Sequence, residues 1–334
     1  LFAVDGGILH LSGIDLAHGY ASSGGGAIYA ESSEVLMSGN ISVISSSAGG
    51  SGGAIYSSRS NVSWNGDATK FSNNSALVNG GAFYSYDSTV SWDGDGTEFS
   101  NNSAVFNGGA FFSDDSTVSW DGDGTEFSNN SAGSYGGAIY SIHSTVSWDG
   151  DGTEFSNNYA GERGGAIFSR SNATWDGVGT NLCTNHADAG FGGAIFAEGL
   201  CGVSWNGPVT FSSNVARDGG GAVALFDFGY KQTDFIDATF IENSSKDGGA
   251  FYVYNSGEGF NFTNVTFSLN AAGDAGGAFA MYAATDHQPA TFSECDFLGN
   301  TANGAGGAIE TLSGHQEFIS CDFEANSAGA GKGT

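Results

Sequence analysis

Basic residues, prolines and long apolar runs are all scarce in this chain of 334 residues. Its 8 Lys and Arg stand against 36 Asp and Glu, which gives a formal net charge of −28. Such a charge repels phosphates, so we expect no nucleic-acid partner and no attraction to anionic membranes. No apolar run approaches the roughly 18–20 residues that a membrane-spanning helix needs. We therefore expect no membrane-spanning segment in this stretch.

Helix-type periodicity is absent, and the chain has only 2 prolines. Glycine is abundant, with 56 residues, but does not recur at every third position, which excludes a collagen-like triple helix. The 26 Phe, 12 Tyr and 6 Trp are too many for a disordered chain. No charged and apolar leader opens the chain at Leu1, so we expect a mature or excised segment of a longer protein.

What the sequence does contain is the motif Gly-Gly-Ala followed by one apolar residue, in eleven copies. Its alanines are Ala27, Ala54, Ala82, Ala110, Ala138, Ala166, Ala194, Ala222, Ala250, Ala278 and Ala308. The steps between them are 27, then eight of 28, then 30 residues. A fixed period of roughly 20–50 residues is the signature of a solenoid. We expect a single domain over residues 1–334, with degenerate repeats in 1–50, regular repeats in 51–226 and looser repeats in 227–334.

Each repeat holds three short runs of alternating apolar residues, separated by Gly, Asn and Asp. Runs with a period of two predict strands, and the polar clusters predict turns. A unit of this length is too short for a four-stranded blade and suits one coil of a solenoid. We therefore predict an all-β parallel β-helix of about eleven to twelve coils, with three short strands per coil.

In such a fold, residues one period apart stack in columns, and three columns are apolar. The first follows Gly-Gly-Ala and holds Ile28, Ile55, Phe83, Phe111, Ile139, Ile167, Ile195, Val223, Phe251, Phe279 and Ile309. The second holds Phe71, Phe99, Phe127, Phe155, Leu182, Phe211, Phe240, Phe267, Phe297 and Phe323, with Leu16 and Val43 at its start. The third holds Trp64, Trp92, Trp120, Trp148, Trp175 and Trp205. Stacking would supply the core that one coil lacks, so we favour a buried Trp column over an exposed sugar-binding strip.

Asparagine stands three residues after each member of the Phe column from Phe71 onward. These residues are Asn74, Asn102, Asn130, Asn158, Asn185, Asn214, Asn243, Asn270, Asn300 and Asn326. A side-chain amide both donates and accepts hydrogen bonds, so stacked copies can bond from coil to coil. We favour a structural asparagine ladder over a catalytic role.

Gly-Gly-Ala-apolar paired with Phe-x-x-Asn resembles the passenger domains of chlamydial polymorphic membrane proteins, and also repeats of other secreted pectin-lyase-like proteins. The resemblance extends over nearly the whole chain. It implies a right-handed β-helix displayed on a cell surface, with an adhesive or structural role.

Acidic turns offer the best candidate for chemistry. The carboxylates at Asp93, Asp95, Asp121, Asp123, Asp149 and Asp151 form two columns, and carboxylates about 5 Å apart repel one another. A hard cation would relieve that repulsion, and Ca²⁺ fits oxygen ligands best, so calcium is a candidate cofactor. A solvated acidic face is the alternative. The six histidines show no metal-ligand spacing.

Two other surfaces carry weaker hypotheses. Thr89, Thr117 and Thr145, with the serines two residues later, form an outward array of the kind that could order water on an ice-binding β-helix. A polysaccharide lyase or hydrolase would need carboxylates with Lys or Arg in a groove, and the eight basic residues form no column with the acidic ones. We therefore expect no enzyme.

The cysteines are four, an even number. Cys295 and Cys321 each stand two residues before the Phe column, so neighbouring coils would bring them within disulfide reach. Cys183 and Cys201 form a second, less certain pair. Buried free thiols are the alternative, but an even number of cysteines favours an oxidising compartment.

Nine Asn-x-Ser/Thr sequons are candidates for N-glycosylation. They lie at Asn40, Asn61, Asn73, Asn101, Asn129, Asn172, Asn243, Asn261 and Asn264. The sequence thus permits a glycosylated surface protein.

Together these features predict an extracellular or cell-surface rod with a structural or adhesive role. Its partners would be further copies of itself, joined end to end into a fibre, or other surface and matrix proteins, or glycans. A carbohydrate-active or carbohydrate-binding β-helix and an ice-binding β-helix are the alternatives.

Overall fold

The computed structural model describes residues 1–199, 203–205, 207–227, 233–255, 259–282, 290–312 and 315–329. These residues form strands and turns and no helix, in about eleven coils that are each one sequence period long. The chain forms two compact units, one of Leu1–Gly161 with Ala166–Asn172, the other of Glu162–Gly165 with Ala173–Thr334. Each unit is a parallel β-solenoid, as predicted, with three sheets running along it. A single domain over the whole chain stays a prediction.

In the first unit, each coil contributes two short strands to the first sheet. The strands that follow Gly-Gly-Ala, with β1 in the same column, are β1 (Phe2–Asp5), β5 (Ile28–Glu31), β9 (Ile55–Ser58), β13 (Phe83–Tyr86) and β17 (Phe111–Asp114). The next strands are β2 (Ile8–Ser12), β6 (Glu34–Ser38), β10 (Asn61–Trp64), β14 (Thr89–Trp92) and β18 (Thr117–Trp120). In β21 (Ile139–Trp148) the two are continuous. Most coils therefore carry four strands, and the Gly-Gly-Ala run and the Trp run, predicted as separate columns, share the first sheet.

The second and third sheets of this unit take one strand from each coil. The second sheet holds β3 (Asp15–Ala17), β7 (Ser42–Ile44), β11 (Lys70–Ser72), β15 (Glu98–Ser100), β19 (Glu126–Ser128) and β22 (Glu154–Ser156). The third holds β4 (Tyr20–Ala21), β8 (Ser47–Ala48), β12 (Ser75–Ala76), β16 (Ser103–Ala104), β20 (Ser131–Ala132) and β23 (Tyr159–Ala160).

The second unit repeats this plan, and the chain enters it within β24 (Ile167–Trp175). Its first sheet holds β27 (Ile195–Glu198), β28 (Val203–Trp205), β31 (Val223–Phe226), β32 (Thr233–Ile236), β35 (Phe251–Tyr254), β36 (Phe260–Thr263), β39 (Phe279–Tyr282), β40 (Ala290–Ser293), β43 (Ile309–Thr311) and β44 (Gln316–Ile319). The second holds β25 (Thr180–Cys183), β29 (Val209–Ser212), β33 (Ala238–Ile241), β37 (Thr266–Ser268), β41 (Asp296–Leu298) and β45 (Asp322–Glu324). The third holds β26 (His186–Ala187), β30 (Val215–Ala216), β34 (Ser244–Asp247), β38 (Ala271–Ala275), β42 (Thr301–Ala302) and β46 (Ser327–Ala328). The predicted insertion at 283–289 lies outside the described residues.

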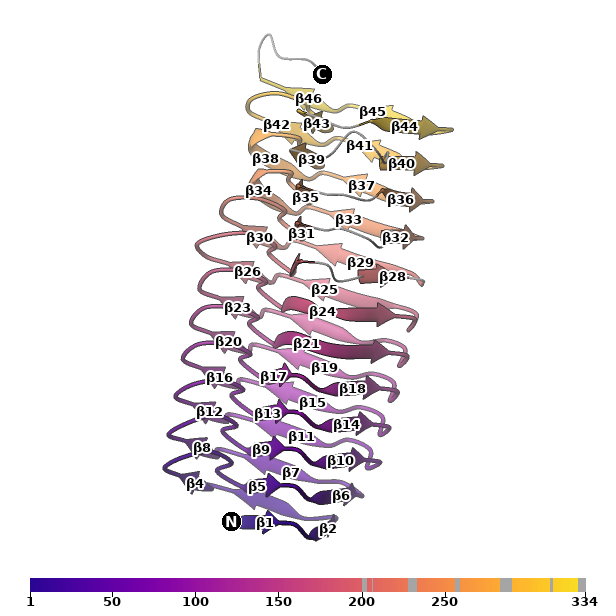
Figure 1. Ribbon diagram of the computed structural model, residues 1–334. Helices are drawn as coiled ribbons and strands as arrows, with labels where there is room; N and C mark the ends of the chain where they lie inside the picture. The colour runs from indigo at the N-terminus through magenta and orange to yellow at the C-terminus, as the bar shows by residue number, and fades with distance from the viewer. Residues whose placement is uncertain are drawn as a thin grey trace. The chain divides into compact units, whose positions relative to one another are not determined.

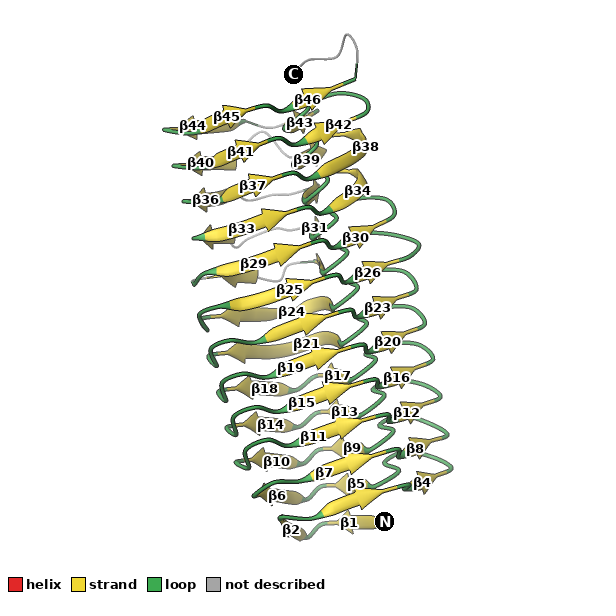
Figure 2. Ribbon diagram, turned by 180° about the vertical axis from the view of Figure 1, so that it is seen from behind, coloured by secondary structure: helices red, strands yellow, loops and turns green. Residues whose placement is uncertain are grey.

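The coils turn in the right-handed sense. In Figure 1, β5 and β6 cross the near face from left to right, and Figure 2 shows β7 returning across the opposite face as the chain climbs. All the paired strands are parallel, and like residues pair: Trp92 lies opposite Trp120 and Phe99 opposite Phe127. The predicted register of one period is therefore confirmed.

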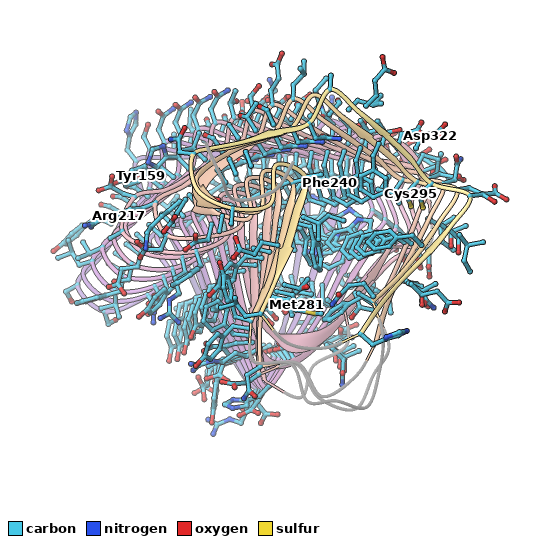
Figure 3. All side chains as sticks on the ribbon, turned by 90° about the horizontal axis from the view of Figure 1, so that it is seen from above. Tyr159, Arg217, Phe240, Met281, Cys295 and Asp322 are labelled. Carbon is cyan, nitrogen blue, oxygen red and sulfur yellow. The ribbon has the colours of Figure 1, made fainter. Side chains whose placement is uncertain are left out.

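Aromatic stacks fill the interior of each unit. The rings of Trp92 and Trp120 are 4.8 Å apart and nearly parallel, and those of Phe99 and Phe127 are 4.7 Å apart. The Phe column packs edge-on against the Trp column, with the Phe99 ring 5.4 Å from the Trp92 ring. In the second unit, Figure 3 shows Phe240 inside the coil and Arg217 on its outside. The buried Trp column leaves no exposed tryptophan strip for sugar stacking among the residues whose burial is described.

The doubled glycine is required by backbone contacts at the bend. Gly80 has a φ of +65°, which a residue with a Cβ adopts only with strain. A Cβ on Gly81 would lie 2.0 Å from the carbonyl oxygen of Gly109 on the next coil. The motif thus permits the coil to bend while its backbone touches the coil above.

Candidate functional site

The acidic turns between the first and second sheets form two different columns. Asp67, Asp95, Asp123 and Asp151 occupy one of them. Here the carboxylate of Asp95 accepts a hydrogen bond from the backbone N–H of Asp123 at 2.9 Å, and Asp123 accepts one from Asp151 at 2.8 Å. Asp67 accepts in the same way from Asp95 at 3.2 Å. These carboxylates therefore help to pair one coil with the next, a role that the sequence did not reveal.

The other acidic column, with Asp93, Asp121 and Asp149, has crowded negative charge. Desolvation, and then the nearby charges of Asp149 and Asp93, raise the pKa of Asp121. Within the described residues, the six aspartates predicted to bind calcium do not bring three carboxylate oxygens within 4.8 Å of one another. A calcium ion would need these side chains to rearrange, and the calcium site stays a prediction.

A third acidic column lies on the second sheet. Glu98 forms a 2.9 Å ion pair with Lys70 of the preceding coil and accepts a hydrogen bond from Ser100 at 2.7 Å. The Ser100 hydrogen bond and the Lys70 ammonium hold the pKa of Glu98 below its usual range. Glu126 and Glu154 lie above Glu98 in register, and Lys70 lies below it in the same column, so the expectation that no basic residue shares a column with acidic ones is wrong for Lys70.

The asparagine column is buried and continuously hydrogen-bonded in each unit. Asn102 donates from Nδ2 to Asn130 Oδ1 at 3.1 Å and to the carbonyl oxygen of Phe71 at 2.9 Å. Its own Oδ1 accepts from the backbone N–H and the Nδ2 of Asn74, both at 3.0 Å. Asn74, Asn130, Asn214, Asn243, Asn270 and Asn300 likewise donate to the next asparagine and to a carbonyl oxygen, so these amides bond coil to coil.

The sequons differ in accessibility. Asn40, Asn61, Asn73, Asn101, Asn129, Asn172 and Asn264 are exposed, and Asn261 is half-buried. Asn243 was predicted both as a ladder residue and as a glycosylation site. Its side chain is fully buried and bonded to Asn270 and Phe211, so the second prediction is wrong for the folded chain. Glycosylation at the other sites stays a prediction.

Cys295 and Cys321 occupy equivalent positions on neighbouring coils, and both are thiols in this structure. Cys295 Sγ lies 3.4 Å from the carbonyl oxygen of Phe262, and Cys321 Sγ lies 3.2 Å from that of Phe292. Burial, with a smaller effect of Cys321, raises the pKa of Cys295 to about 12. The disulfide between them stays a prediction. Cys201 lies outside the described residues, so the predicted disulfide between Cys183 and Cys201 stays a prediction.

The Ser/Thr face points outward as expected. Thr89, Thr117 and Thr145 are exposed and lie opposite one another on β14, β18 and β21. The serines two residues later are half-buried, and the intervening valines are buried.

An aromatic column on the outer side of the first sheet was not predicted. It holds Tyr29, Tyr56, Tyr84, Phe112, Tyr140 and Phe168, with ring centroids 4.8–5.1 Å apart. These rings stack on one another, so their faces are not available to a ligand. The sequence does carry a signal for this column, because an aromatic residue recurs at the second position after Gly-Gly-Ala in these six repeats.

None of the described residues forms a helix long and apolar enough to cross a membrane. No curated protein and no solved structure matches this chain. Five segments do match a family model, the Chlamydia polymorphic membrane protein repeat, at residues 34–58, 68–86, 124–142, 152–170 and 294–311. The segment 68–86 contains both Phe71-x-x-Asn74 and Gly80-Gly81-Ala82. The chain thus carries repeats of the Chlamydia polymorphic membrane protein type, built here as the coils of a β-solenoid.

Proposed function

We propose that this chain is a surface-exposed β-solenoid with a structural or adhesive role. The observation that carries the proposal is the match of five segments to polymorphic membrane protein repeats, which suggests exposure on a cell surface. The outward columns support it, because identical polar side chains recur on successive coils about 4.8 Å apart. Such an array would bind a repetitive partner through many weak contacts.

Surface exposure can be tested with antibodies raised against the chain. They should label intact cells of the source organism without permeabilisation. Labelling only after permeabilisation would contradict the proposal. For the adhesive role, beads coated with the folded chain should bind cells or matrix proteins, and beads coated with unfolded chain should not. Equal binding by both would remove the support for adhesion.

End-to-end assembly of this 334-residue chain is a further part of the proposal. In the last described coil, Phe318 and Phe323 are 43% and 49% exposed, whereas Phe292 and Phe297 of the preceding coil are fully buried. With Ile309 and Gln316 they line a hollow of about 830 Å³. A further coil, supplied by the chain's own continuation or by a second copy, would cover these rings and extend the sheets.

Sedimentation over a range of concentrations tests assembly, at high salt to screen the charge of −28. We expect growing particles for the native chain and smaller ones for Phe323→Asp. Tyr254→Asp changes an exposed ring away from this end and is the control. Monomers at every concentration would contradict assembly.

Ice binding is a second candidate, favoured only by the exposed and aligned Thr89, Thr117 and Thr145. Micromolar chain should then shape ice crystals into facets, and Thr117→Lys should abolish the effect. Round crystals with the native chain would exclude it.

A further inference from the structure

Three metal-binding side chains meet on the first unit, outside the acidic turns discussed above. Asp114 ends β17, Asp115 follows it, and His143 lies in β21 on the next coil. One ligand atom from each lies within 4.8 Å of the others. His143 Nδ1 is 3.2 Å from Asp114 Oδ1.

Strand register creates this grouping. Asp114 lies opposite Ile142, and the backbone N–H of Asp115 donates to the Ile142 carbonyl at 3.3 Å. His143 therefore stacks over Asp115, which stands one period earlier in the chain. Spacing along the chain shows no metal-ligand pattern for the histidines, whereas the solenoid period brings His143 close to two carboxylates.

The ligand types favour a first-row transition metal. One imidazole nitrogen and two carboxylate oxygens suit Zn²⁺, whereas Ca²⁺ prefers oxygen ligands alone. Ligands bound to one zinc ion at about 2.0–2.2 Å lie within about 4 Å of one another, so small side-chain rotations suffice here. Asp87 lies on the preceding coil, where its N–H donates to the Asp114 carbonyl at 3.1 Å, and it adds negative charge nearby.

We propose that Asp114, Asp115 and His143 form a divalent metal site that takes Zn²⁺ in preference to Ca²⁺. His143 and Asp115 are exposed, which leaves room for water molecules as further ligands. The competing interpretation is an ion pair between His143 and Asp114 alone. Replacing Asp115 distinguishes the metal site from the ion pair, because an ion pair between His143 and Asp114 does not need Asp115.

Titration calorimetry of the full chain with ZnCl₂ tests the site. We expect one saturable site that His143→Gln and Asp115→Asn each weaken by at least about tenfold, since losing a ligand should cost no less than losing a second-shell partner. Asp115→Asn keeps the His143–Asp114 pair and suits the φ of +49° at this position. CaCl₂ should not compete at equal concentration.

His186→Gln is the matched control, because His186 Nε2 lies 3.7 Å from Asp188 in a comparable exposed pair. It should leave the zinc affinity unchanged. Equal affinity in the native chain and in Asp115→Asn, or no saturable heat with the native chain, would overturn the proposal. Circular dichroism of each variant verifies its fold.

Discussion

Two of the buried tryptophans, Trp64 and Trp148, donate from Nε1 to a threonine five residues later, whereas Trp92 Nε1 has no partner within the described part of the chain although Thr97 holds that position. Trp148 donates from Nε1 to Thr153 Oγ1 at 2.9 Å, two residues before the Phe column. In the coil of Trp205, Val209 holds the equivalent position. Among the described residues, Trp205 Nε1 is buried and has no hydrogen-bond partner. A buried donor without a partner lowers stability.

Replacing Val209 with Thr should supply the missing acceptor at nearly constant volume. We expect the free energy of unfolding to rise by about 1 kcal/mol, measured by urea denaturation. The converse change, Thr69→Val, should lower it by about 1–3 kcal/mol because it removes the acceptor that lies 2.8 Å from Trp64 Nε1. A Val209→Thr variant that is less stable than the native chain would contradict the explanation that Trp205 Nε1 lacks a hydrogen-bond acceptor.

The raised pKa of Asp121 has a defined consequence for pH dependence. The folded chain holds this proton more tightly than the unfolded chain, so the ionised carboxylate opposes folding as pH rises through the raised pKa. Asp121→Asn should therefore raise the melting temperature at pH 7 and leave it unchanged near pH 3. The gain should shrink in about 1 M NaCl. An equal gain at both pH values would contradict this explanation.

Elements in this fold are held together by side-chain ladders as well as by strand pairing. Asn102→Ala would remove the acceptor of the Asn74 amide groups and the donor to the Phe71 carbonyl, all within the core. We expect a loss of roughly 3 kcal/mol or more in urea denaturation. Asn101→Gly is the control, because Asn101 is exposed with a φ of +55° that glycine also adopts. Similar losses in both variants would argue against the ladder.

Strand columns followed from the sequence because the period is visible in large apolar residues. Trp92 and Phe99 recur one period later as Trp120 and Phe127, so register needed no other information. The outer column with Tyr84 was missed, since its alternation predicted a solvent-facing side. The Tyr84 ring stacks between the rings of Tyr56 and Phe112. Burial raises the pKa of Tyr84 to about 12, and the charges of Tyr56 and Asp114 add smaller effects.

The acidic turns show a different limit of prediction. Their columns could be counted from the sequence, but the direction of each carboxylate depends on backbone geometry. Asp123 bonds to the N–H of Asp151, whereas Asp121 faces other carboxylates. Residue type and spacing are the same for both, so only the structure separates them.

At the scale of the whole molecule, each coil pairs only with its neighbours, which makes coils interchangeable within a unit. Deleting residues 89–116 from the first unit would join Ser88 to Thr117 and place Trp64 against Trp120. We expect the variant to keep its β-type circular dichroism and a cooperative melt. Deleting residues 89–102 removes half a coil, places unlike residues in each column and should abolish the cooperative melt. Equal behaviour of the two deletions would contradict a modular solenoid.

Disulfide trapping measures coil register directly. In a variant with the native cysteines changed to serine, Thr89→Cys with Thr117→Cys places thiols on neighbouring strands about 4.8 Å apart, within disulfide range. Thr89→Cys with Thr145→Cys separates them by two coils, about 9.6 Å, which is too far. The account predicts rapid cross-linking of the first pair and none of the second under mild oxidation. A first pair that stays reduced, or a second pair that cross-links equally well, would show that residues one period apart do not touch.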